Sequence, residues 1–254
     1  MRVIIAYIFI FGLVNFLYGQ STQEKVNEVS RILPDSTIIK FEFYYMEDSL
    51  YKIYIYESDV LKSVGFTKDK DKIENIHYVG FFQSFHKNGK VRLEGEYNYS
   101  HLHEGEWKEY YESGQLLSIK VCKNGLLSGK YICYYESGGL KEKGEFGTKE
   151  YRIDNKLHIM DSKIGFWTAY HPNGTKECEG NYWFGAIIEF TNDEYKEQEQ
   201  KYGVTFYPQY RQDMRHGYWS YWNDKGLLEK KEEYYKGILI QELKIEEQGI
   251  PPRE

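Results

Sequence analysis

The residues with the clearest chemical potential form one histidine cluster, His101-Leu102-His103-Glu104. Two histidines one residue apart on an extended segment could hold a metal ion from one side. The cluster lies in a turn between repeats, however, and the other turns of this kind carry unrelated residues. We therefore predict no metal site here. His171 and His216 each lie beside a repeat landmark, and we expect turn or strand roles for them rather than catalysis.

Carboxylates are the second group that could do chemistry. Glu94, Glu96, Glu142 and Glu145 lie near lysines on segments that look like strands. A pair of carboxylates can cleave a glycosidic bond, but cross-strand pairs on a solvated sheet surface explain this pattern better. The sequence contains no nucleophile elbow, phosphate-binding loop, zinc-protease helix motif or dinucleotide fingerprint. We predict no catalytic residue and no cofactor, and a hydrolase is the least favoured alternative.

The secondary-structure elements that must position these residues are indicated by one spacing of glycine and aromatic residues, which occurs five times. Each copy opens with a glycine, has aromatic residues two and five positions later, and has a turn glycine at position nine. The copies are Gly80-Phe82-Phe85-Gly89, Gly105-Trp107-Tyr110-Gly114, Gly129-Tyr131-Tyr134-Gly138, Gly165-Trp167-Tyr170-Gly174 and Gly217-Trp219-Trp222-Gly226. Such regularity predicts a repeat architecture, and repeats usually build extended surfaces rather than one catalytic pocket.

Each repeat reads as a β-hairpin. The glycine at position nine permits the positive φ of a tight turn, and Asn-Gly at Asn88-Gly89 and Asn173-Gly174 is a strong hairpin signal. The returning strand often has a glycine at position fifteen and an aromatic residue at position seventeen. Repeat two breaks both rules, with Lys120 and Cys122 at these places. The prediction is an all-β fold, an elongated antiparallel meander of repeated hairpins.

The aromatic residues at positions two and five have opposite parity. On regular strands they would point to opposite faces, whereas a β-bulge could turn both inward. We favour a buried spine at position two, and the alternative is an exposed row that binds sugars or choline-like cations. The candidate binding residues are Phe82, Trp107, Tyr110, Tyr131, Tyr134, Trp167, Tyr170, Trp219 and Trp222.

The amino-terminal end resembles an export signal. Arg2 precedes an uncharged, mostly apolar run from Val3 to Tyr18, and Gly19-Gln20-Ser21 offers a plausible cleavage point. The run is shorter than the roughly 20 residues that a spanning helix needs. We therefore predict a cleaved signal peptide at 1–19 and a periplasmic or secreted protein, with an uncleaved anchor as the alternative.

Residues 20–79 lie outside the repeat pattern. A capping-box-like start at Ser21 and helical spacing of Val26 and Val29 predict a short helix over 22–32. A strand pair at 38–45 and 50–56 follows, and then a charged linker at 68–72.

The repeat array is expected to cover 80–243. Repeat starts are unevenly spaced, which indicates insertions near 147–164 and 183–213. Gly237 to Gln241 looks like a truncated last copy that caps the array, and 244–254 is predicted to be a flexible tail.

Composition narrows the choice of partners. The formal net charge is −6 and both signs are mixed along the chain, so the basic footprint of a nucleic-acid-binding protein is missing. The three cysteines show no metal-ligand spacing. We favour free, buried thiols, although Cys122 and Cys133 flank a turn and a disulfide between them stays open.

At these residues the chain resembles the MORN-repeat superfamily, in the variant form of bacterial YwqK-type, antitoxin-like proteins. The resemblance rests on Gly105 to Leu116, Gly165 to Gly174 and the linker Lys123 to Gly129, and it covers 80–243. It implies a β-meander used for interaction, with membrane lipids or toxins among the associated partners. We predict an exported, non-enzymatic scaffold that binds a protein. The alternatives are a binder of cell-wall glycan or lipid and a toxin-neutralising protein.

Overall fold

The structure is a computed structural model that describes residues 24–70, 73–153, 156–184 and 213–244. The predicted signal peptide, most of the second insertion and nearly all of the predicted tail lie outside these residues. The described chain contains strands and no helix, and no part of it could therefore cross a membrane as a helix. It divides into two units, 1–78 and 79–254.

The first unit contains four antiparallel strands in chain order. They are β1 (Lys25–Ile32), β2 (Ile38–Tyr45), β3 (Tyr51–Glu57) and β4 (Val60–Thr67). The predicted strand pair is present as β2 and β3, but β4 was not predicted. Its turn, at Ser58 and Asp59, has positive φ at both residues. Such turns usually contain glycine or asparagine, and neither residue type occurs at these two positions, so the usual turn signal is missing.

The helix predicted over 22–32 is wrong for Lys25–Ile32, which forms β1; residues 22 and 23 lie outside the described part. The backbone of β1 pairs antiparallel with β2. Val26, Val29 and Ile32 suit a strand because they are β-branched. The helical spacing of these apolar residues does not outweigh the pairing with β2 and the strand preference of β-branched side chains.

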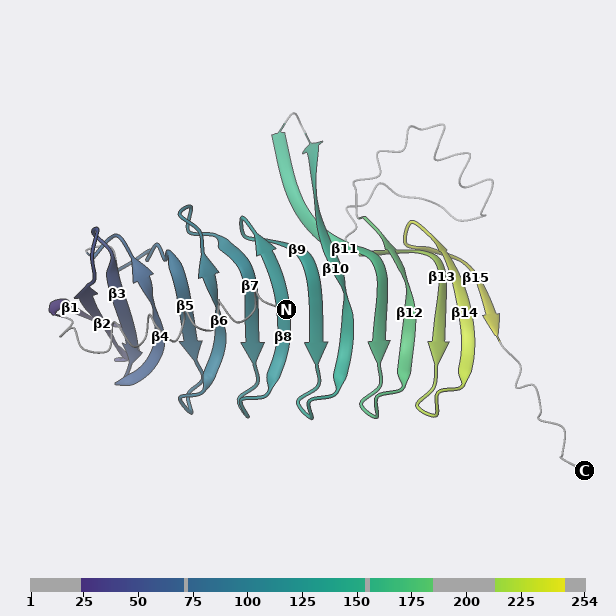
Figure 1. The fold of residues 1–254 in the computed structure, drawn as a ribbon, viewed down its shortest axis with the longest axis horizontal. Helices are drawn as coiled ribbons and strands as arrows, with labels where there is room; N and C mark the ends of the chain where they lie inside the picture. The colour runs from purple at the N-terminus through teal and green to yellow at the C-terminus, as the bar shows by residue number, and fades with distance from the viewer. Residues whose placement is uncertain (1–23, 71–72, 154–155, 185–212, 245–254) are drawn as a thin grey trace, which may run out of the picture. The chain divides into compact units, whose positions relative to one another are not determined.

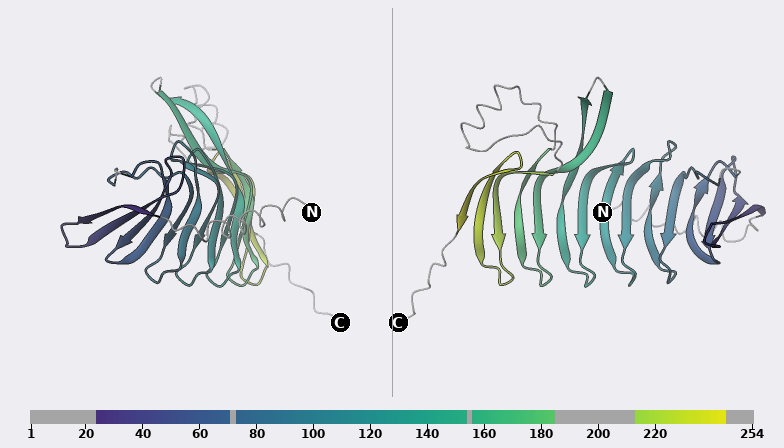
Figure 2. Two further views of the ribbon diagram at one scale, coloured as in Figure 1. Left: turned by 60° about the vertical axis from the view of Figure 1, so that its left-hand side comes forward. Right: turned by 180° about the vertical axis from the view of Figure 1, so that it is seen from behind.

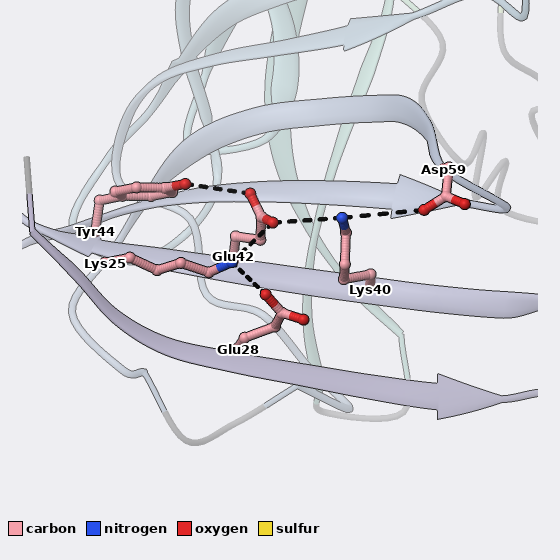
Figure 3. Close-up of polar contacts among 6 residues, drawn as sticks. All are labelled: Lys25, Glu28, Lys40, Glu42, Tyr44 and Asp59. Carbon is pink, nitrogen blue, oxygen red and sulfur yellow. Dashed lines mark hydrogen bonds and ion pairs between the residues drawn. The ribbon is translucent and has the colours of Figure 1, made fainter.

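The two faces of the first unit differ in character. Phe41, Phe43 and Ile53 form a buried core, and the partly buried Ile73 and Ile76 pack against it. The other face carries Glu42, whose carboxylate is shown in Figure 3 among the side chains of its neighbours.

Glu42 connects the first two strands through charge. It accepts hydrogen bonds from Lys25 Nζ of β1 at 3.0 Å and from Tyr44 Oη at 3.3 Å, and Lys40 Nζ lies 3.4 Å away (Figure 3). Lys25 also pairs with Glu28. The hydrogen bond from Lys25 lowers the pKa of Glu42, so the carboxylate stays ionised at neutral pH.

The second unit is an antiparallel meander in which each strand pairs with the next one in the chain (Figure 1). Its strands are β5 (Gly80–Phe85), β6 (Val91–Tyr97), β7 (His103–Tyr110), β8 (Leu116–Lys123), β9 (Leu126–Tyr134), β10 (Leu140–Ile153), β11 (Lys156–Tyr170), β12 (Lys176–Trp183), β13 (Met214–Trp222), β14 (Leu228–Tyr235) and β15 (Ile238–Lys244). The predicted all-β meander of hairpins is confirmed.

One turn geometry closes all five hairpins. In the first repeat, His86 N–H donates to Lys90 O and Gly89 N–H donates to His86 O, and the other four repeats form the same two bonds. The turn glycines Gly89, Gly114, Gly138, Gly174 and Gly226 have φ between 77° and 89°. A side chain at these positions would be strained, which explains why this glycine recurs.

The first predicted insertion is an extension of a hairpin. Residues 147–153 of β10 continue to pair with 156–162 of β11. In Figures 1 and 2 these two strands run well past the ends of their neighbours. The expected last copy is β15, which pairs with β14.

Candidate functional site

The strand register assigns the two rows of aromatic residues to opposite faces of the sheet. Phe82, at position two, lies directly opposite Gly95, at position fifteen. Tyr110, at position five, donates its hydroxyl hydrogen to Glu94, the neighbour of Gly95, at 2.7 Å. Since neighbours along a strand point to opposite faces, the two rows are separated. We call the side with Phe82 the aromatic face and the other side the opposite face.

Each tryptophan at position two packs on the glycine at position fifteen of the preceding repeat. A Cβ atom built on Gly95 would lie 2.3 Å from Trp107 Cδ2, one on Gly144 would lie 2.2 Å from Trp167, and one on Gly180 would lie 2.4 Å from Trp219. The glycines therefore make room for the indole rings. Where this glycine is replaced by Lys120, the next repeat has the smaller Tyr131.

The other side of each indole ring is covered by the residue four positions earlier. His103 stacks on Trp107 with ring centroids 3.8 Å apart. Lys163 Nζ lies 4.0 Å from the centroid of Trp167, and Arg215 Cζ lies 4.6 Å from that of Trp219. Cations attract the faces of aromatic rings. Before Tyr131 the same place holds Leu127.

These contacts explain how one layer of sheet buries tryptophan. Trp107, Trp167 and Trp219 are 0%, 1% and 2% exposed. Their ring faces are occupied, so they form the floor of the aromatic face and cannot stack on a sugar. The sequence contained the signal for the covering residues, a cation or histidine four positions before each tryptophan, but our sequence analysis missed it.

The surface of the aromatic face is formed by half-buried tyrosine and phenylalanine. Tyr97 contacts Trp107 edge-on at 5.2 Å, Phe146 contacts Trp167 at 5.3 Å, and Tyr182 contacts Trp219 at 4.9 Å. Lys120 interrupts the row of aromatic side chains, because it lies between Trp107 and Tyr131 and is opposite both of them in the sheet. The face is thus two runs of rings with basic side chains among them.

The aromatic residues at position five are half-buried on the opposite face. They are Phe85, Tyr110, Tyr134, Tyr170 and Trp222. The side chain of the residue after each of the first four donates a hydrogen bond to the backbone carbonyl of the position-five residue in the repeat that packs beside it. These bonds are His86 to Tyr110 at 2.8 Å, Tyr111 to Tyr134 at 2.9 Å, Tyr135 to Tyr170 at 2.7 Å and His171 to Trp222 at 2.8 Å. His171 therefore joins two repeats.

Arg215 is the centre of a polar cluster on the aromatic face. Its guanidinium donates to Tyr221 Oη at 2.7 Å and to Tyr234 Oη at 3.0 Å, and it lies 3.8 Å from buried Glu232. Burial alone would raise the pKa of Glu232, but hydrogen bonds from Lys230, Tyr221 and Tyr234 lower it to about 2. The cluster is internally satisfied and contains no general base near neutral pH.

The remaining candidates also have structural partners. Glu104 accepts from Asn124 N–H at 2.9 Å, and Glu142 pairs with Lys163. No group of histidine, cysteine, aspartate or glutamate side chains suited to a metal ion occurs among the described residues. Cys122 lies opposite Leu127, whereas Cys133 lies opposite Ser118, and both thiols are free.

His103 lies at the junction of the first two repeats, opposite Tyr97 and stacked on Trp107. Burial, with the charge of Lys120, lowers the pKa of His103 below its ordinary value of 6.5. The unfolded chain therefore binds this proton more readily, and stability should fall as the pH drops below about 6.5. We expect His103→Leu to lose less stability than the wild type between pH 7.5 and 5.5 in urea unfolding. Parallel losses in both proteins would contradict this role.

Comparison with known families supports the repeat assignment in part of the array. A family model described as the MORN repeat variant matches residues 80–99, 104–124 and 127–146. The structure continues the same turn bonds and glycine–tryptophan contacts in the fourth and fifth repeats. No curated protein matches the chain. MORN repeats commonly bind proteins or membranes, and the family is generally non-enzymatic.

Proposed function

We propose that the chain is an exported, non-enzymatic scaffold that binds a protein partner on its aromatic face. The supporting observation is the row of half-buried rings over a buried tryptophan floor, with Lys120, Lys163 and Arg215 among them. Tyrosine, tryptophan and arginine are the residues most enriched at interface hot spots.

The architecture also favours binding over catalysis. Among the described residues, the main contacts between strands are contacts between neighbours in the sheet. No second layer of described strands therefore covers the aromatic face. Repeat arrays commonly bind their partners on an extended surface of this kind. The predicted signal at 1–19 supports a periplasmic or secreted location, where a partner would be met.

The proposal is tested by crosslinking capture with the mature chain, Gln20 to Glu254, from the envelope and medium of its own cells. Tyr131→Thr removes one ring from the aromatic face and should lower recovery of the partner at least tenfold, as expected for a hot-spot ring. Phe166→Thr is the control, because Phe166 is 56% exposed on the opposite face. Near-ultraviolet circular dichroism verifies that both variants are folded.

Each result has a definite meaning. One protein recovered by the wild type and the control, but not by Tyr131→Thr, would support the proposal. An exported toxin as that protein would define the partner and give the chain a neutralising role. Retention on purified cell-wall material or lipid vesicles, with no protein recovered, would refute a protein partner.

A further inference from the structure

We propose that a cavity on the opposite face binds a small organic carboxylate with an apolar body. The cavity has a volume of about 400 Å³ and lies where β9, β10 and β11 run side by side (Figure 1). Ligand pockets in proteins usually have volumes of roughly 300–1,000 Å³. The site is separate from the aromatic face, so it does not rest on the protein partner proposed above.

A bulge in β11 opens the cavity. Three residues of β11, 165–167, lie across from the single residue Gly144 of β10, because the register shifts between Lys143 and Glu145. Gly165 has a φ of 61°, and a Cβ atom built on it would meet nothing within 4 Å. A bulged strand bends locally, so the sheet is hollowed here rather than flat.

Apolar side chains form the walls of the cavity. Ile132 of β9 and both Ile164 and Phe166 of β11 line it. Phe166 is 56% exposed, which leaves much of a large apolar ring in contact with water. The apolar body of a ligand would cover these side chains, and removing apolar surface from water favours binding.

Two lysines provide positive charge at the same cavity. Lys130 and Lys143 line it, and neither forms an ion pair with another described residue. Lys143 Nζ lies 6.0 Å from the ring centroid of Tyr170, a contact that does not neutralise its charge. Glu145 lies directly opposite Lys130 but is not paired with it. Two cations and one carboxylate leave a net charge of +1 around the cavity, which is complementary to a monocarboxylate.

The same bulge in another repeat has the opposite charge. The register of β6 and β7 shifts at the equivalent place. The residues there that correspond to Lys143, Glu145, Ile164 and Phe166 are all glutamates, namely Glu94, Glu96, Glu104 and Glu106. Like charges repel, so a carboxylate should bind between β9 and β11 and not between β6 and β7.

An amide NMR titration of the mature chain with phenylacetate tests this site. A ligand of this size should bind with a dissociation constant of about 1 mM. The signals of 130–132, 143–145 and 164–168 should move, and those of β6 and β7 should not. Acetate, which lacks the apolar body, should bind at least about tenfold more weakly. Phenethylamine, which carries the opposite charge, should not cause these shifts.

Charge variants give predictions of opposite sign. Lys130→Gln combined with Lys143→Gln should weaken phenylacetate binding about fivefold, as expected for the loss of two exposed ion pairs, whereas Glu145→Gln should tighten it about twofold. The matched control is Lys225→Gln with Lys231→Gln, because both lysines are exposed and neither lines the cavity. It should bind phenylacetate like the wild type.

The outcomes are distinct from those of partner capture. Equal affinities of all variants, shifts confined to another surface, or no shift with phenylacetate at about 20 mM, well above the expected dissociation constant, would overturn the proposal. Failure to capture a protein would leave it unaffected, because the aromatic face is a different surface. Phe166→Thr remains a valid control for capture for the same reason, and it should weaken phenylacetate binding.

Discussion

Replacing Gly144 with lysine is expected to destabilise the array by at least about 3–5 kcal/mol, comparable with losing a buried tryptophan. A Cβ atom at this position would lie 2.2 Å from Trp167 Cδ2, and Trp167 is 1% exposed. The ring would have to leave its place, because the overlap is with the indole itself and not with a flexible side-chain end. Urea unfolding followed by tryptophan fluorescence measures the loss.

The chain itself suggests the variant that should rescue this defect. Lys120 occupies the equivalent place in the second repeat, and the residue that faces it in the third repeat is Tyr131. Adding Trp167→Tyr to Gly144→Lys copies this natural pair and should recover more than half of the lost free energy. Coupling of this size is typical of residues in direct contact.

Gly139→Lys is the matched control for the glycine replacement. Gly139 lies in the same hairpin, its φ is not positive, and a Cβ atom there would meet nothing closer than 3.8 Å. Its effect should stay below about 1 kcal/mol, as is usual for surface sites. If Gly144→Lys and Gly139→Lys were equally stable, the glycine would not be making room for the tryptophan.

Replacing Arg215 with methionine should cost about 1.5–3 kcal/mol, the range for hydrogen bonds that involve a charged group. The change keeps an apolar stem but removes the cation from Trp219 and the donor bonded to Tyr221 and Tyr234. It also leaves Glu232, which is 6% exposed, with fewer compensating charges.

The opposite face supplies the control for Arg215. Lys231 is exposed on β14 and lies opposite Ser220. Lys231→Met should change the free energy of unfolding by less than about 0.5 kcal/mol, as expected for a surface position. Chemical denaturation at neutral pH measures the free energy of unfolding of both variants. Equal losses of this free energy would show that the cluster around Arg215 adds no particular stability.

Spacing alone determined the repeat, its hairpins and its turns. The glycine at position nine and the aromatic residues at positions two and five recur at fixed intervals, and local turn chemistry does not depend on distant contacts. The sequence was compatible with two arrangements of the aromatic rows, on opposite faces of the sheet or on the same face. The observed register places them on opposite faces.

Local signals were misleading where pairing decided the structure. Lys25–Ile32 has helical spacing but lies along β2, and the turn before β4 contains Ser58 and Asp59 in place of glycine. Tertiary pairing overrides weak local preference in such segments.

The contact of Gly144 with Trp167, and of each tryptophan with the histidine or cation four residues before it, appeared only in the tertiary structure. The sequence contained these residues at regular positions, but the glycine and the ring that it accommodates belong to different repeats. Their contact depends on how one hairpin is placed beside the next, a distance that spacing within a repeat does not specify. The sequence by itself therefore determined the hairpin, whereas the tertiary structure decided which face buries its tryptophans and which rings remain for a partner.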